Sequence, residues 1–110
     1  MTEYTVKELV YKHETAFMPE KTTGIDAIVQ YHLTGNEGGD FIITIGNDQC
    51  SVSEGVAENP VVIMTAEAGY FRKILLGKED GMKGYLEGKL QLEGNLKLAM
   101  KLTGYFDLGD

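Results

Sequence analysis

Apolar residues recur at helical spacing near the start of the chain, which predicts an N-terminal helix. The positions that repeat every three or four residues are Val6, Leu9, Val10, His13 and Phe17. Thr5 and Glu8 have the T-x-x-E spacing of a capping box, in which each side chain satisfies a free backbone N–H group of the other residue. Pro19 cannot continue a helix, because it lacks the N–H group. We therefore expect a helix from about Thr5 to Phe17.

Strict alternation of apolar and polar residues then predicts strands, because successive side chains of a strand point to opposite faces. Within residues 27–34, one face carries Ala27, Val29, Tyr31 and Leu33, and the other carries Ile28, Gln30, His32 and Thr34. We expect the first face to be buried and the second face to be exposed. The inward side of the next strand would consist of Phe41, Ile43 and Ile45.

A tight turn separates this strand from a third one. Asn47-Asp48 predicts a hairpin, because both residues tolerate a positive φ. Cys50 and Val52 follow on the inward side of a shorter strand. Residues 54–60 are expected to form a loop, and the β-branched residues of segment 61–64 predict a buried fourth strand.

The period changes to that of helices after residue 64. Thr65 is a candidate N-cap, with Glu67 in the first turn and Gly77 at the C-terminal end. The apolar stripe of this helix would be Phe71, Ile74 and Leu75, and a short second helix would carry Met82, Tyr85 and Leu86. Leu90 and Leu92 predict a fifth strand, and Gly94-Asn95 would begin a last helix. A meander of strands with helices layered on one face is an α+β sandwich.

Composition is that of one globular domain, which we expect to span residues 1–110. The chain has 110 residues, of which 43% are hydrophobic and 25% are charged. Cys50 is the single cysteine, so an intramolecular disulfide and a cysteine-based zinc cluster are excluded. We expect neither a metal site nor a cofactor. No apolar stretch approaches about 18 residues, and residues 1–4 lack the pattern of a secretory signal, so we expect a cytoplasmic protein.

Charge is unevenly distributed along the chain. The net charge of −7 argues against nucleic acid as a partner, because nucleic acids bind basic surfaces. Residues 1–69 contain three lysines and eleven acidic residues, whereas residues 70–110 contain seven basic and six acidic residues. One interpretation is that the acidic residues keep the protein soluble and that the basic side chains form the solvent-exposed faces of helices. The other is that Arg72, Lys97 or Lys101 offers a cation to a carboxylate or phosphate head group or to a lipid surface.

Sequence motifs for catalysis are missing. Gly35–Gly39 is rich in glycine, but no Gly-Lys pair is followed by the serine or threonine that a phosphate-binding loop needs. Cys50 could form a nucleophile–base pair with His13 or His32, although a buried cysteine more often acts as a small hydrophobic residue. Asp26 and Glu93 could share a pocket. We expect that the protein is not an enzyme.

The second half of the chain resembles the sterol carrier protein type 2 family. That family has a Gly-Lys pair, a small helix, a G-K-L-x-[IVL]-x-G-[DN] strand and turn, and an L-A-x-K-L helix. The corresponding segments here are Gly77-Lys78, Met82–Tyr85, Gly88–Asn95 and Leu98–Leu102. Upstream, residues 29–35 resemble the family's V-Q-F-x-[IL]-[ST]-G strand, and residues 38–41 resemble its G-G-x-[WF] segment. The resemblance covers residues 24–106 in one register.

The resemblance implies a five-stranded, mainly antiparallel sheet covered on one face by helices, with an apolar tunnel between the layers. It implies non-enzymatic binding, with transfer, of a lipid: a fatty acid, a fatty acyl derivative or a sterol-like molecule. The residues that would contact this lipid are Met64, Phe71, Ile74, Leu75, Met82, Tyr85, Leu86, Leu90, Leu92, Ala99 and Met100. Besides the lipid, a transient membrane contact, a homodimer or a partner enzyme would fit the same fold.

Two other interpretations stay open at this point. The chain could be a structural or dimerisation module of the same fold, in which Phe71, Tyr85 and Phe106 close the cavity. It could also be an enzyme that acts on a small lipid through Asp26, His32 or Glu87. The enzyme would require a carboxylate or histidine of strongly shifted pKa inside the cavity.

Overall fold

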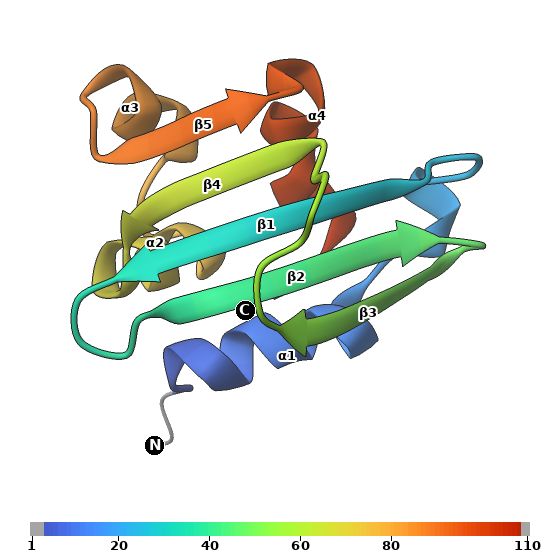
Figure 1. Ribbon diagram of the computed structural model, residues 1–110, viewed down its shortest axis with the longest axis horizontal. Helices are drawn as coiled ribbons and strands as arrows, with labels where there is room; N and C mark the ends of the chain where they lie inside the picture. The colour runs from blue at the N-terminus through green and yellow to red at the C-terminus, as the bar shows by residue number, and fades with distance from the viewer. Residues whose placement is uncertain (1–3, 109–110) are drawn as a thin grey trace.

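The structure, a computed structural model, describes residues 4–108, and its elements follow the predicted order (Figure 1). The helices are α1 (Val6–Ala16), α2 (Ala68–Leu75), α3 (Gly81–Leu86) and α4 (Leu96–Lys101), and 3₁₀ turns span Pro19–Lys21 and Leu102–Tyr105. The strands are β1 (Ala27–Thr34), β2 (Gly39–Gly46), β3 (Gln49–Glu54), β4 (Val62–Glu67) and β5 (Leu90–Gly94). The predicted lack of a secretory signal concerns residues 1–4, of which residues 1–3 lie outside the described residues.

The five strands form one mixed sheet in the order β3-β2-β1-β4-β5. β1, β2 and β3 pair antiparallel, as the predicted meander requires, and β5 pairs antiparallel with β4. β4 lies parallel to β1. β3 lies at one edge of the sheet and β4 lies beyond β2 and β1, so the chain between β3 and β4 crosses the sheet. The predicted α+β class is confirmed.

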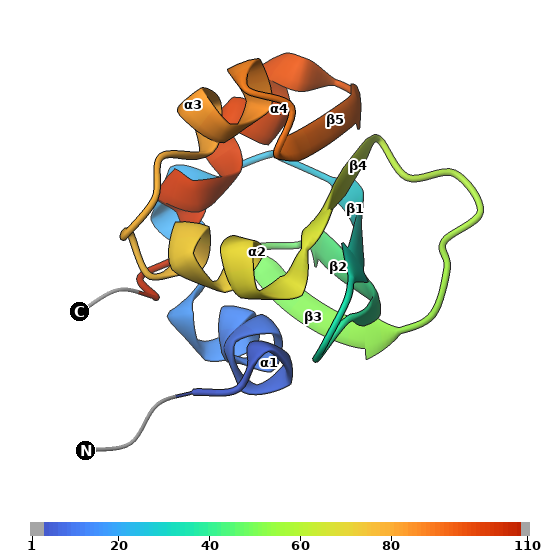
Figure 2. The same cartoon turned by 90° about the vertical axis from the view of Figure 1, so that its left-hand side faces the viewer.

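All four α-helices pack on one face of the sheet (Figure 2). α1 contacts β3, α2 contacts β1 and β4, and α4 contacts β4 and β5. The sheet face beneath them is apolar and buried, and it includes Val29, Tyr31, Ile43, Val62 and Met64. The connection from β3 to β4 runs over the opposite face (Figure 2).

Two local signals in the sequence produce the predicted geometry. The Thr5 hydroxyl accepts a hydrogen bond from the Glu8 N–H group at 3.1 Å, and Glu8 Oε1 accepts one from the Thr5 N–H group at 2.8 Å. This capping box begins α1 at Val6. Asn47 and Asp48 have φ angles of 53° and 59°, as the tight turn between β2 and β3 demands.

The prediction that Thr65 begins a helix is wrong. β4 continues to Glu67, because Thr65 is paired on both sides, with His32 of β1 and Gln91 of β5. The helix cap is Glu67 itself, whose carboxylate accepts hydrogen bonds from the N–H groups of Gly69 and Tyr70, both at 3.0 Å. Strand pairing therefore extends β4 by three residues beyond the predicted end.

Gln30 lies on the face predicted to be exposed, but it is 4% exposed. The β3–β4 connection covers it and uses its amide for hydrogen bonding. Gln30 Nε2 donates to the Gly55 carbonyl at 2.9 Å, and Gln30 Oε1 accepts from the Ala57 N–H group at 2.7 Å. The alternating pattern could not show this, because the covering segment comes from a distant part of the chain.

Gly94 should be irreplaceable, because its backbone passes directly over Val61. Its φ is +94°, and a Cβ atom there would lie 2.2 Å from the Val61 carbonyl oxygen. That oxygen also accepts the Asn95 N–H group at 2.8 Å at the start of α4. We expect Gly94→Ala to lower the free energy of unfolding by about 2–4 kcal/mol, measured by chemical denaturation.

The matched control for this prediction is Gly104→Ala. A Cβ atom at Gly104 meets nothing within 4 Å and requires no positive φ. We expect this control to change the stability by less than about 0.5 kcal/mol. Equal stability of the two variants would show that the close approach at Gly94 is unimportant.

Candidate functional site

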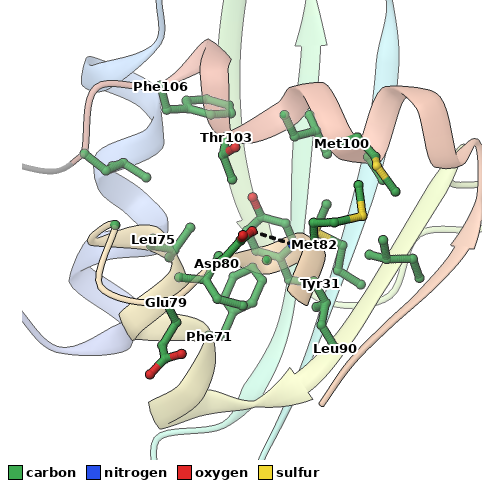
Figure 3. Close-up of a pocket in the computed structure, with 18 of the residues that line it drawn as sticks. Tyr31, Phe71, Leu75, Glu79, Asp80, Met82, Leu90, Met100, Thr103 and Phe106 are labelled. Atoms are coloured by element: carbon green, nitrogen blue, oxygen red, sulfur yellow. Dashed lines mark hydrogen bonds between the residues drawn. The ribbon is translucent and has the colours of Figure 1, made fainter. Parts of the chain in front are cut away.

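A cavity of about 450 Å³ lies between the sheet and helices α2, α3 and α4 (Figure 3). On the sheet side, its walls come from Tyr31, Met64, Leu90 and Leu92. On the helix side, they come from Phe71, Ile74, Leu75, Met82, Ala99 and Met100. The segment after α4 adds Leu102, Thr103, Phe106, Asp107 and Leu108, and α1 adds His13. The walls are therefore apolar over most of their surface, and the volume falls in the range of small-molecule sites.

Nine of the eleven residues predicted to contact a lipid line this cavity. These are Met64, Phe71, Ile74, Leu75, Met82, Leu90, Leu92, Ala99 and Met100. Tyr85 and Leu86 do not line it, and Leu86 is 76% exposed. α3 is only six residues long, so of its predicted stripe only Met82 reaches the cavity. Contact of these residues with a ligand stays a prediction.

Other wall residues are absent from the predicted lipid contacts. Tyr31 lies on the predicted buried face of a strand, but periodicity alone does not connect it to a cavity. His13 lies on the apolar stripe of α1, which gives no sign that it reaches a cavity formed mainly by the second half. Only the tertiary packing of α1 beside the chain end reveals its position, where its ring lies 4.4 Å from that of Phe106.

His13 and Tyr31 form a buried polar pair in the cavity wall. His13 Nδ1 lies 2.9 Å from the Leu9 carbonyl oxygen, which can only accept, so this nitrogen carries the hydrogen. His13 Nε2 therefore accepts the hydroxyl hydrogen of Tyr31, at 2.9 Å. Burial lowers the pKa of His13 to about 4 and raises the pKa of Tyr31. Both side chains are thus uncharged near neutral pH.

The rim of the cavity combines methionines with acidic residues. Met82 and Met100 line the cavity and are 45% and 41% exposed. Glu79, Asp80 and Asp107 are exposed and also contribute to the wall. Asp80 Oδ1 accepts the Met82 N–H group at 3.0 Å and so begins α3 (Figure 3).

The cations predicted near the cavity mouth do not line this cavity. Among residues 4–108, the wall includes neither lysine nor arginine. Lys97 and Lys101 line a separate hollow beside Tyr105. Arg72 Nε donates to the Tyr4 carbonyl at 2.8 Å, on the α1 side of α2. Arg72 of α2 and Lys97 and Lys101 of α4 point outward because the apolar positions of these two helices face the sheet.

The candidate catalytic residues are not brought together. Both ring nitrogens of His13 are already bound, and His32, on the face of β1 opposite Tyr31, contacts Asp40. Burial, with the nearby Glu14 charge, raises the pKa of Cys50 to about 12, which is opposite to the shift that a nucleophile needs.

The residues named for an enzyme and for a shared acidic pocket also lie apart from the cavity. Asp26, His32, Glu87 and Glu93 are exposed and none of them lines it. Within the described residues, no group of three histidine, cysteine or acidic side chains could hold a metal ion. Over the same residues, no helix is both long and apolar enough to span a bilayer.

Residues 7–107 match the SCP-2 sterol transfer family, so the chain belongs to this family, as the resemblance predicted. The hydroxysteroid dehydrogenase-like protein 2 of Xenopus laevis is 30% identical over 90 residues, which cover 81% of this chain and 22% of that protein. The chain thus spans less than a quarter of the length of this curated relative.

Solved structures share the fold. The sec-alkylsulfatase Pisa1 from Pseudomonas sp. superimposes with a TM-score of 0.76 at 18% identity, over 86% of this chain and 15% of that one. Palmitated SCP2L2 from Aedes aegypti superimposes with a TM-score of 0.73 at 23% identity, over 94% of this chain and 93% of that one. The same architecture therefore occurs within a large enzyme and in a chain of similar size.

The depressed pKa of His13 predicts a loss of stability in acid. The unfolded chain binds a proton at His13 below about pH 6.5, whereas the folded protein does so only near pH 4. The stabilisation is therefore complete above pH 6.5 and is lost between about pH 6.5 and 4, by on the order of 3 kcal/mol. We expect urea unfolding to show this loss, and the loss should be absent in His13→Gln.

The control for the acid prediction is His32→Gln, which removes an exposed histidine. This variant keeps the buried His13 and should therefore keep the same loss of stability between pH 6.5 and 4. If His13→Gln shows an unchanged pH dependence, burial of neutral His13 does not contribute to folding.

Proposed function

We propose that the cavity binds the hydrocarbon part of a lipid without covalent chemistry, and that the protein carries or presents this lipid. The ligand class is a fatty acid, a fatty acyl derivative or a sterol-like molecule. The observation that supports the proposal most strongly is the apolar cavity of about 450 Å³ between sheet and helices. Membership of the SCP-2 sterol transfer family and the fold shared with palmitated SCP2L2 are consistent with it.

Binding would be driven by transfer of the hydrocarbon chain out of water. Each buried methylene contributes about 0.8 kcal/mol, so about fifteen of them give on the order of 12 kcal/mol. Immobilisation of the ligand costs at least about 4 kcal/mol. The difference corresponds to a micromolar dissociation constant or somewhat tighter binding, which allows both capture and release.

In this proposal the cavity serves as the apolar tunnel between the two layers, and the rim is the entrance. Met82 and Met100 are half-exposed there. Methionine side chains are flexible and polarisable, so they can fit hydrocarbon chains of different shape. A transient membrane contact, a homodimer, a partner enzyme and the cytoplasmic location stay predictions.

The alternative of a structural or dimerisation module with a closed cavity has weaker support. Phe71 and Phe106 do line the cavity, as that interpretation requires, but space for a ligand is left beside them. Tyr85 does not contribute to the wall. The enzyme alternative has less support, since none of Asp26, His32 and Glu87 lines the cavity.

Filling the cavity should abolish lipid binding. Ala99 of α4 is 5% exposed and lines the wall, so Ala99→Phe directs a large ring into the space. We expect the neutral dye Nile red to bind the unmodified protein saturably, with micromolar affinity, and Ala99→Phe to weaken it at least about tenfold. Mass spectrometry of lipids extracted from the purified protein should identify a bound lipid.

Leu86→Phe is the matched control for the cavity-filling variant. It adds a ring at an exposed position of α3 outside the wall. This control should bind Nile red like the unmodified protein, and circular dichroism should show that both variants are folded. Absence of saturable dye binding and of any extracted lipid would contradict the proposed function.

A further inference from the structure

We propose that the cavity selects an uncharged lipid that carries a hydroxyl group, and that the buried Tyr31–His13 pair is the polar anchor for this hydroxyl. The inference rests on the proposed function and narrows its ligand class. It follows from what the buried polar side chains of the wall can donate and accept.

The Tyr31 oxygen is a buried hydrogen-bond acceptor on a side chain that lines the cavity. Tyr31 is 2% exposed and belongs to the wall. Its hydroxyl hydrogen is used in the 2.9 Å bond to His13 Nε2, because His13 Nδ1–H already donates to Leu9. The oxygen keeps lone-pair capacity for a ligand. A lipid hydroxyl can donate to it, whereas an ester or an ionised head group without hydrogen cannot.

If a ligand entered the cavity with an anionic head group first, this group would meet no positive charge in the buried wall. His13 is the basic side chain in the buried wall, and burial keeps it neutral by lowering its pKa to about 4. Moving an ion from water into an apolar site is unfavourable unless the ion is paired. The buried part of the wall at His13 and Tyr31 therefore disfavours a carboxylate, sulfonate or phosphate.

The exposed part of the wall also acts against an anionic head group. It includes the carboxylates of Glu79, Asp80 and Asp107. Lys78 and Lys101 are neighbours of wall residues in the sequence, but neither belongs to the wall. Like charges around an opening act against an anionic ligand and leave an uncharged ligand unaffected. Both parts of the wall thus select against anions.

An uncharged alcohol fits both the buried acceptor and the acidic residues of the wall. Its hydroxyl would reach Tyr31, and its chain would lie along Met64 and Leu92 toward Met82 and Met100 at the rim. Those four side chains are apolar and all line the cavity. The buried anchor is then the group that distinguishes an alcohol from an ester of the same chain length.

The first experiment ranks three ligands that carry a sixteen-carbon chain. Hexadecan-1-ol, methyl palmitate and 1-hexadecanesulfonate are delivered from methyl-β-cyclodextrin at pH 7 and low salt, and they displace Nile red. We expect the alcohol to bind about 3- to 10-fold more tightly than the ester, in line with one hydrogen bond. The sulfonate should bind about tenfold more weakly than the alcohol, and added salt should reduce this difference.

Two variants separate the anchor from the rim. Tyr31→Phe should remove the preference for the alcohol over the ester. Asp80→Asn/Asp107→Asn should strengthen sulfonate binding several-fold relative to alcohol binding. The asparagine introduced in place of Asp80 keeps a side-chain oxygen that can accept the Met82 N–H group, so α3 should still form.

The outcomes distinguish the inference from the proposed function. If Nile red and all three ligands fail to bind, the proposed function fails and the inference fails with it. If the sulfonate binds as tightly as the alcohol, or if folded Tyr31→Phe keeps the alcohol preference, lipid binding stands but the selection is overturned. If circular dichroism shows that Tyr31→Phe is unfolded, the selection is tested by the ranking of the three ligands and by Asp80→Asn/Asp107→Asn.

Discussion

The parallel pairing of β1 with β4 is the constraint on which the rest of the structure depends. It forces the β3–β4 connection to cross the sheet, and this connection crosses the face opposite the helices (Figure 2). Gln30 holds the connection through Gly55 and Ala57, and the Val61 N–H group donates to Ile28 at 2.8 Å. The inner face therefore stays free for the helical layer. Because Glu67 ends β4 and caps α2, the chain turns onto that face without a linker.

Local sequence determines much of this fold, since several signals act within a few residues. The capping box at Thr5, the turn at Asn47-Asp48 and the cap at Asn95 each require only neighbouring backbone groups. The predicted end of β4 is wrong because pairing with two neighbouring strands outweighs the helix signal at Thr65. The burial of Gln30 escapes prediction for a related reason, since a segment distant in the sequence covers it.

The candidate site divides in the same way between what is predictable from sequence and what is not. Apolar wall residues such as Phe71 and Leu90 follow from periodicity, because the face that packs is also the face that lines the cavity. The charges do not follow from a count of basic residues. The second half carries more basic than acidic residues, but its lysines point away from the apolar faces, and the acids at Asp80 and Asp107 stand at the opening. Only the three-dimensional arrangement gives the sign of the local charge.

The polar pair in the wall has a structural role that makes it a suitable ligand anchor. His13 is bound at both ring nitrogens, so its orientation is fixed before any ligand arrives. Tyr31 packs against Phe71, with ring centroids 4.8 Å apart, and is therefore held in place as well. A preorganised acceptor loses little entropy when a ligand hydroxyl binds, and preorganisation favours affinity.

The proposed release of a lipid would be easier if part of the wall can move, and the structure concentrates weak packing in one region. α3 and α4 are six residues each, and each buries a single residue, Gly84 and Ala99 respectively. Helices with so little buried surface separate from a fold at lower free energy than the core does. The sheet and α1, by contrast, are anchored by Val29, Leu9 and Val10, which are fully buried. Opening can therefore expose the cavity beneath α3 and α4 while the β-sheet and the His13–Tyr31 pair keep their geometry.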